Sequence, residues 1–161
     1  MRYIIREKIF HLGEDSAITD ESGQPVFQVD GKIFSLHNTL VVRDLAGNEV
    51  AKVERQLISL TPTYDITVHG QEIAEVRKKI FSPFIDRYTI DIPGPDDLAI
   101  DGSLLEHEYT VRRGDTVVAT VSKAWMSLTA TYGVDIVPGE NDLVILASVL
   151  ALDLAEDQEH H

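Results

Sequence analysis

The chain has 161 residues, which is the size of a single domain and enough to bury a substantial core. Its 27 acidic residues outnumber its 14 basic residues and give a formal net charge of −13, which argues against nonspecific binding to nucleic acid or to an anionic membrane surface. Cysteine is absent, so disulfides and thiolate metal sites are excluded. The first eight residues, MRYIIREK, contain no apolar region of the signal-peptide kind, so we expect a cytoplasmic protein.

The first predicted elements are two short strands. Residues 2–11 and 16–19 read as strands, and the segment around Gly13 connects them. Residues 20–23 (DESG) have the composition of a turn.

From residue 23 onward, one pattern of residues occurs four times. The copies begin at Gly23, Gly47, Gly70 and Gly114. Each copy reaches a valine after six or seven positions, and a serine stands six positions after that valine. Three copies then continue with a tyrosine and alternating aliphatic residues, beginning at Tyr64, Tyr88 and Tyr132. A repeat of this kind indicates one supersecondary unit used four times.

Each copy predicts a β-hairpin. Its first strand alternates with period two, and in three copies the aliphatic face also carries a basic residue. These matched residues are Arg55, Lys78 and Lys123. We expect the same face to continue through Leu57 in the second copy and through Trp125 in the last.

Residues 93–96 (PGPD) interrupt the repeat, and residues 97–101 and 109–113 read as a further strand pair. Two strands at the start, eight in the repeats and two here give about twelve. Consecutive hairpins of this regularity are typical of an antiparallel meander that is closed or nearly closed. The expected fold class is therefore mainly β.

The longest apolar run, residues 143–152, contains Ser148 as its one polar residue. A membrane-spanning helix needs about 20 apolar residues, and a buried strand usually has about 4–8. A buried helix over about 141–154 fits the run best. Asn141 or Asp142 is expected to cap its N-terminus, and Ser148 to bond a backbone carbonyl one turn back.

The barrel and the helix each meet a need of the other. A barrel of about twelve strands is too wide for its own side chains to fill, and a helix that is apolar on every face must be surrounded. We therefore predict a closed antiparallel barrel around a central hydrophobic C-terminal helix, as one domain over residues 1–156. Residues 157–161 are expected to form a disordered tail, whose two final histidines resemble the start of a purification tag.

Asp153 stands at the end of the predicted helix, where a carboxylate opposes the helix dipole. We expect it to be exposed at the barrel mouth or paired with a basic residue, either Arg2 or Arg6.

Several stretches of the chain resemble the LURP-one-related proteins, whose fold is that of the Tubby C-terminal domain. They are 18–20 (ITD), 30–35 (DGKIFS), 118–125 (VATVSKAW), 131–136 (TYGVDI) and 142–153. The resemblance covers essentially the whole chain and implies a twelve-stranded barrel threaded by a C-terminal hydrophobic helix. Relatives of this fold include phosphoinositide-binding Tubby proteins and phospholipid scramblases, while the family itself has no well-established activity.

The basic residues are the candidate ligand-binding groups. Arg55, Lys78 and Lys123 at matched positions, with Lys79 from the basic run 77–79, could hold a phosphate or a carboxylate. The alternative is that each strand bends at this position, so that the side chain leaves the core and reaches water. The basic run is then a solvated strand face.

No motif of a nucleophilic, glycine-rich or paired-carboxylate site occurs in the chain. Four aspartates lie close together in the sequence without the spacing of an EF-hand loop: Asp91, Asp96, Asp97 and Asp101. Four histidines are dispersed and are predicted to lie on the surface: His11, His37, His69 and His107. We expect no metal and no cofactor.

These observations favour a non-enzymatic binding or interaction module in the cytoplasm, with no transmembrane segment and no nucleic-acid partner. The alternative is a peripheral protein that binds phospholipids or phosphoinositides, as the relatives of the fold imply. The identity of the ligand or partner is left open by the sequence.

Overall fold

The computed structural model of the chain describes residues 1–6, 16–30, 39–82, 85–92, 97–125 and 130–159, and only the backbone of 79–82, 85–87 and 157–159. The strands in these residues are β1 (Arg2–Arg6), β2 (Ser16–Asp20), β3 (Pro25–Asp30), β4 (Thr39–Arg43), β5 (Glu49–Arg55), β6 (Thr63–Val68), β7 (Gln71–Ser82), β8 (Ile85–Asp91), β9 (Leu98–Ser103), β10 (Glu108–Arg113), β11 (Thr116–Ser122) and β12 (Thr131–Ile136). They are followed by the helix α1 (Asp142–Glu159).

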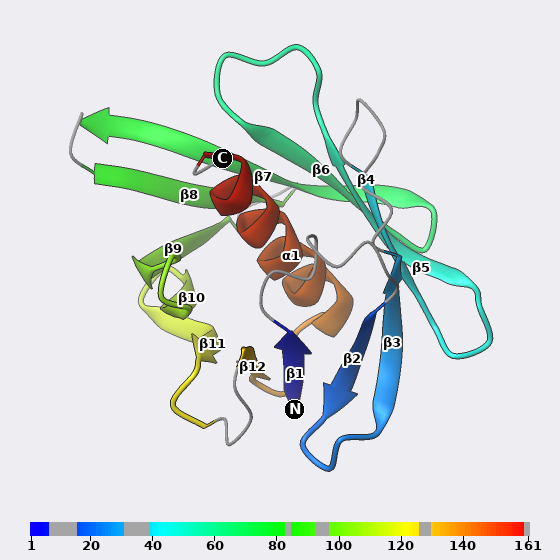
Figure 1. Cartoon of the computed structure of the whole chain (residues 1–161). Helices are drawn as coiled ribbons and strands as arrows, with labels where there is room; N and C mark the ends of the chain where they lie inside the picture. Colours follow the sequence, from blue (N-terminus) through cyan, green and yellow to red (C-terminus); the bar gives the residue numbers. More distant parts are fainter. Residues whose placement is uncertain (7–15, 31–38, 83–84, 93–96, 126–129, 160–161) are drawn as a thin grey trace.

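The strands form one antiparallel sheet that closes into a barrel around α1 (Figure 1). Each strand pairs with the strands before and after it in the chain, and the barrel closes where β1 pairs with β12, with Tyr3 opposite Val134. The predicted fold class, a closed antiparallel barrel of twelve strands around a C-terminal helix, is confirmed.

The repeated units are hairpins, as predicted, and β5–β6, β7–β8 and β11–β12 are antiparallel pairs. The repeat glycine lies in the turn before each unit. At Gly70 the reason is clear, because His69 and Gly70 both have positive φ (48° and 80°) in a two-residue turn between β6 and β7. A turn with this backbone matches the twist of the two strands and favours glycine. The predicted strands 97–101 and 109–113 are β9 and β10.

Two of the predicted inward faces end earlier than expected. β5 ends at Arg55, so Leu57 lies in the following loop, and β11 ends at Ser122, so Trp125 lies beyond that strand. The prediction was wrong in β5 because the alternation of apolar residues continues in the sequence beyond the end of the strand. In the structure, the backbone N–H of Gln56 donates to the Thr63 carbonyl (2.9 Å) and closes the loop that follows. Within the predicted strand 2–11, the residues after Arg6 lie outside the described residues.

α1 passes through the barrel, as Figure 1 shows in orange to red. From Val144 to Ala155 every side chain except that of Asp153 is buried. Asn141 Oδ1 accepts the Val144 N–H (3.3 Å) and caps the helix, as one of the two predicted caps. The Ser148 hydroxyl donates to the Val144 carbonyl (2.7 Å), also as predicted.

The helix runs to Glu159, several residues beyond the predicted end near 154. Leu154 and Ala155 are still buried, so the barrel continues to cover the helix there. Residues 157–159, which we expected in a disordered tail, are helical, and 160–161 lie outside the described residues.

The wall of the barrel supplies the other half of the core. Each strand contributes at least one side chain that is essentially inaccessible to solvent: Ile5, Ile18, Val29, Leu40, Val53, Ile66, Val76, Ile90, Leu98, Val111, Val121 and Val134. These residues alternate with outward-facing ones, as the period of a strand requires. Among the strands, β5, β6 and β7 make the most extensive contacts with α1.

Replacing Leu146, which is fully buried in the middle of α1, tests the central helix. Leu146→Ala should lower the free energy of unfolding by about 2–5 kcal/mol, because it removes apolar contacts and leaves a cavity. Chemical denaturation followed by circular dichroism measures the change.

The control is Leu45→Ala in the turn between β4 and β5, where the side chain is 66% exposed. It should change the free energy of unfolding by no more than about 0.5 kcal/mol. Equal effects of the two substitutions would contradict the burial of α1.

Candidate functional site

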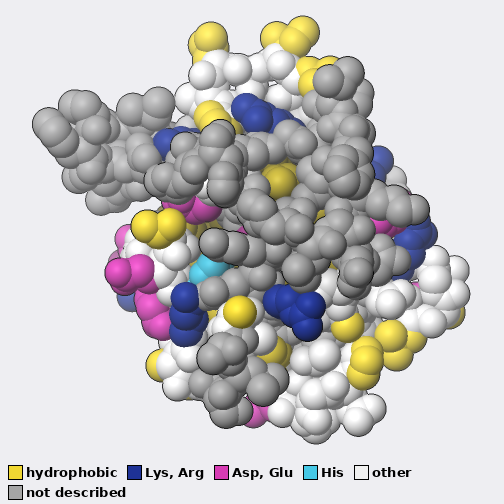
Figure 2. All heavy atoms as spheres, viewed as in Figure 1, with side chains coloured by type: hydrophobic (Ala, Val, Ile, Leu, Met, Phe, Trp, Pro, Cys, Tyr) yellow, Lys and Arg dark blue, Asp and Glu magenta, His cyan; other side chains and the backbone are white. Residues whose placement is uncertain are grey.

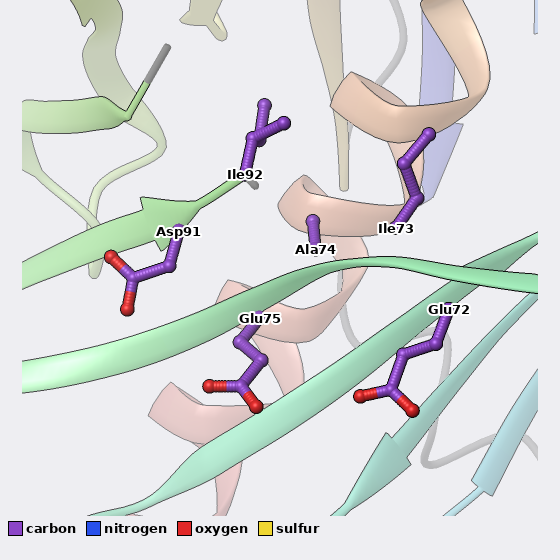
Figure 3. A pocket seen from close by; sticks show the side chains of 6 residues that line it. All are labelled: Glu72, Ile73, Ala74, Glu75, Asp91 and Ile92. Atoms are coloured by element: carbon purple, nitrogen blue, oxygen red, sulfur yellow. The ribbon is translucent and has the colours of Figure 1, made fainter. Parts of the chain in front are cut away.

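Since α1 fills the barrel, we expect surfaces that could contact other molecules at the ends and on the outer wall of the barrel. Two cavities of about 290 Å³ and 180 Å³ lie in the described part of the chain. The larger is drawn in Figure 3, with its carboxylates on the side away from α1 and Ile73 and Ile92 toward the helix. The smaller shares Ile73 and Ile92 and extends to Arg113 and Glu140. Neither is lined by the predicted basic residues in the described set.

Arg55 and Lys78 lie on either side of β6 at one end of the barrel. Each follows a buried valine at a spacing of two, Val53 and Val76, so both side chains leave their strands on the inward face. Both are half-buried and have further interactions within the chain. The backbone N–H of Lys78 donates to the Pro62 carbonyl (3.3 Å), which connects β7 to the loop between β5 and β6.

Lys123 lies on the opposite wall. It follows β11, and five strands separate β11 from β5 in either direction round the barrel. The Lys123 side chain is exposed, and its backbone N–H donates to the Glu108 carboxylate (2.9 Å). The side chain of Lys79 lies outside the described residues. The matched basic residues therefore do not share one wall, and their binding of an anion stays a prediction.

The loop over residues 56–62, between β5 and β6, presents aliphatic side chains to solvent. Leu57 and Ile58 are 63% and 94% exposed, and Leu60 is fully exposed. We name these three side chains the aliphatic tip. The loop is at the top of Figure 1, and Figure 2 shows hydrophobic side chains in the same place with Lys and Arg side chains directly below them. Singly exposed apolar residues are normal, but three within four positions are a candidate contact surface.

The sequence reading missed the aliphatic tip because Leu57 fitted the alternation of the preceding strand. One signal was present, since the segment LISLTP ends in a proline that cannot continue a central ladder. The Ser59 hydroxyl donates to the Thr61 carbonyl (2.5 Å), a local bond of the kind that competes with strand pairing.

Carboxylates gather on the outer face of the same wall. Oxygen atoms of Asp65, Glu72 and Glu75 lie within 4.8 Å of one another. Gln56 Nε2 donates to Asp65 (2.8 Å) and Glu75 (3.2 Å), and Arg77 donates to Glu75 (2.7 Å). Neighbouring side chains therefore already satisfy part of this negative charge. Of the four aspartates noted in the sequence, Asp101 pairs with Arg112 (3.2 Å), Asp91 lies near Arg77 (3.8 Å), and Asp96 lies outside the described residues.

The two ends of α1 are held by carboxylates. At the first turn the Tyr3 hydroxyl donates to Asp142 Oδ2 (2.5 Å). Burial, together with this bond to a carboxylate, raises the pKa of the Tyr3 hydroxyl far above its usual range, so it stays a donor. Near the other end, Asp153 accepts a hydrogen bond from the Tyr132 hydroxyl and lies 2.9 Å from His107 Nε2.

The contacts of Asp153 correct two predictions. Its partner is His107 rather than Arg2 or Arg6, and Arg2 instead lies near Asp135 (3.8 Å). His107 is not a surface histidine, since its side chain is 15% exposed and its ring stacks on Tyr132 (4.2 Å between centroids).

The other three histidines noted in the sequence are His11, His37 and His69. His69 is exposed, as predicted. His11 and His37 lie outside the described residues.

Tyr109 lies near this polar group, toward the C-terminal end of α1. Its side chain is buried, and in the described contacts its hydroxyl has no hydrogen-bond partner. Burial, and to a lesser degree the negative charge of Asp153, raises the pKa of Tyr109 well above its ordinary value. Asp153 is the shared partner of Tyr132 and His107, and these two contacts hold the helix in place.

A model of the family described as LURP-one-related matches residues 1–153. The chain belongs to the LURP-one-related family. The resemblance predicted from the sequence is thus confirmed. The chain is similar to the uncharacterized protein YxjI of Bacillus subtilis. The two are 31% identical over 150 residues, which cover 93% of this chain and 90% of that protein.

A solved structure supports the fold. The X-ray structure of a protein from Arabidopsis thaliana superposes with a TM-score of 0.66, covering 98% of this chain and 90% of that one. At 18% identity this likeness concerns the fold alone. Within the described residues, no helix has both the length and the apolar character needed to cross a membrane.

Asp153→Ala tests the polar group that Asp153 forms with Tyr132 and His107 near the C-terminal end of α1. It should lower the free energy of unfolding by about 2–3 kcal/mol, because the Tyr132 hydroxyl and the His107 ring lose a largely buried acceptor. Urea denaturation measures it. The matched control is Asp135→Ala, whose carboxylate is 47% exposed beside Arg2 and should contribute less than about 1 kcal/mol. A larger loss from the control would refute this role of Asp153.

Glu140 gives a pH-dependent prediction. Arg113 donates to both of its oxygens (2.6 Å and 3.0 Å) and holds its pKa below the ordinary value of 4.5. A carboxyl whose pKa is lower when folded stabilises the protein above the unfolded-state pKa and loses that contribution as pH falls through the folded-state pKa.

The variant Glu140→Gln should therefore be less stable than the unmodified chain at pH 7, by about 1 kcal/mol. The difference should shrink as the pH is lowered below about 4.5. Denaturation at a series of pH values measures it, and a difference that grows on acidification would contradict the pairing with Arg113.

Proposed function

We propose that this LURP-one-related protein is a non-enzymatic binding module of the cytoplasm, and that it contacts its partner through the aliphatic tip. The observation that carries the proposal is that the exposed side chains of Leu57, Ile58 and Leu60 stand together within four positions, whereas other exposed aliphatic side chains, such as Leu45 and Leu105, stand singly. Removing such side chains from water on contact is favourable, at roughly 25 cal/mol per Å² of apolar surface.

The filled barrel supports a contact on the outside. Ile145, Leu146 and Val149 of α1 are within 2% of complete burial, so the helix occupies the space that other barrels offer to a ligand. A binding module of this type works through its ends and loops. The net charge of −13 supports a partner other than nucleic acid.

A peripheral phospholipid-binding function is the second candidate. Arg55 and Lys78 favour it, because both lie at the barrel end that bears the aliphatic tip and both suit the phosphate of a lipid headgroup. The remaining charge of the molecule opposes long-range attraction to an anionic membrane. Headgroup recognition at this end would therefore depend on local contacts.

A cysteine scan of the aliphatic tip tests the proposed contact, since the chain has no cysteine of its own. Leu57→Cys and Leu45→Cys place thiols at sites of nearly equal exposure, 63% and 66%, on loops at opposite ends of β5. In buffer, both should react at similar rates with a maleimide. In an extract of the source cells, position 57 should react several-fold more slowly, while position 45 should not change.

The membrane and soluble fractions of the extract separate the two candidates. Protection by the soluble fraction supports a macromolecular partner, and protection by the membrane fraction supports phospholipid binding. Equal reaction rates at position 57 in buffer and in the whole extract would overturn the proposed function.

A further inference from the structure

We infer that the aliphatic tip enters the interfacial layer of a phospholipid bilayer, so that the end of the barrel that holds Arg55 and Lys78 faces the lipid phosphates. This step rests on the proposed function and names the partner of the same surface. The chemistry is a combination of aliphatic burial and phosphate contact at one end of the barrel.

The composition of the loop suits insertion. No charged residue occurs between Gln56 and Tyr64, so no charge would have to leave water as the loop enters an apolar layer. The backbone of the loop is closed at its base by the bond from the Gln56 N–H to the Thr63 carbonyl (2.9 Å). The loop therefore presents its side chains from a fixed base at the end of two strands.

The shape of the surface is convex. Ile58 and Leu60 are almost or fully exposed, so no described part of the chain covers them. Energetic centres of protein interfaces are usually aromatic residues or arginine within well-packed patches, and leucine and serine are under-represented there. A protruding Leu-Ile-Ser-Leu segment fits a fluid apolar layer better than the pocket of a protein.

The cations stand behind the aliphatic tip. Arg55 ends β5 directly before the loop, and the Lys78 backbone bonds to Pro62 at the end of the loop. Figure 2 shows Lys and Arg side chains below the hydrophobic ones at this end. Peripheral binding usually needs two signals, and an apolar insertion with nearby cations provides them.

Only the cations near the aliphatic tip complement the charge of lipid phosphates, and this determines how vesicle binding depends on salt. The net charge of −13 repels an anionic bilayer at a distance, and added salt screens that repulsion. Burial of aliphatic side chains is not screened. Binding that depends on the aliphatic tip should therefore persist at high salt, whereas binding through headgroup charges alone should be lost.

The experiment uses the full chain with an environment-sensitive fluorophore on Leu57→Cys or, as the matched control, on Leu45→Cys. Vesicles of phosphatidylcholine, with and without a quarter of phosphatidylserine, are added at low salt and at about 0.5 M salt. Emission from position 57 should increase and shift to the blue with both vesicle types and at both salt concentrations. Emission from position 45 should not change.

A triple variant measures how much the aliphatic tip contributes to vesicle binding. Leu57→Ser, Ile58→Ser and Leu60→Ser together should lower the vesicle partition coefficient of the unlabelled protein at least tenfold, at roughly three- to tenfold for each side chain. The exposure of these residues means that the variant should still fold, and its circular dichroism and unfolding transition verify this.

Three results would overturn the inference. If the protein sediments with vesicles while the label at position 57 is unchanged, the lipid contact lies elsewhere. If no vesicle binds while position 57 is protected in the soluble fraction of the extract, the partner is a macromolecule and the proposed function stands. If the label responds to protein concentration without vesicles, the aliphatic tip contacts a second copy of the chain.

Discussion

The burial of α1 inside the barrel is the constraint on which the rest of the structure depends. Twelve strands enclose more space than inward-facing valines and isoleucines can fill, and the helix supplies the missing volume with leucine, isoleucine, valine and alanine. In return the sheet covers every face of a helix that would otherwise be insoluble. Each element buries the apolar surface of the other, so we expect the chain to unfold as one cooperative unit.

Carboxylates determine where the helix lies along the barrel. Asp142 meets Tyr3 at one end, and Asp153 meets Tyr132 and His107 near the other. Apolar contacts alone specify position poorly, because they are not directional. The hydrogen bonds at both ends select one depth and one rotation. Because α1 continues to Glu159, Asp153 lies before the last turn, where the helix dipole would oppose a carboxylate, and its hydrogen bonds serve to position the helix.

Most of the fold could be predicted from the sequence because its signals are periodic. Alternation within the repeats indicated the hairpins, and the unbroken apolar run indicated the helix. The end of β5 could not be predicted in this way, since Leu57 continues the alternation and only the last ladder pair, Arg55 with Tyr64, shows where the strand stops. The partner of Asp153 was missed because His107 is 46 residues away and comes near only when α1 lies inside the barrel.

The order of the elements in the chain has a consequence for biosynthesis. All twelve strands precede α1, and the closing pair β1–β12 joins residues more than a hundred positions apart. A ribosome therefore makes most of the sheet before it makes the element that fills it. Until α1 emerges, the inner face of that sheet is an apolar surface with no core, so folding must be largely post-translational and slow to begin. Newly made chains should be clients of chaperones that hold exposed β-strands, and messages truncated before α1 should yield aggregates.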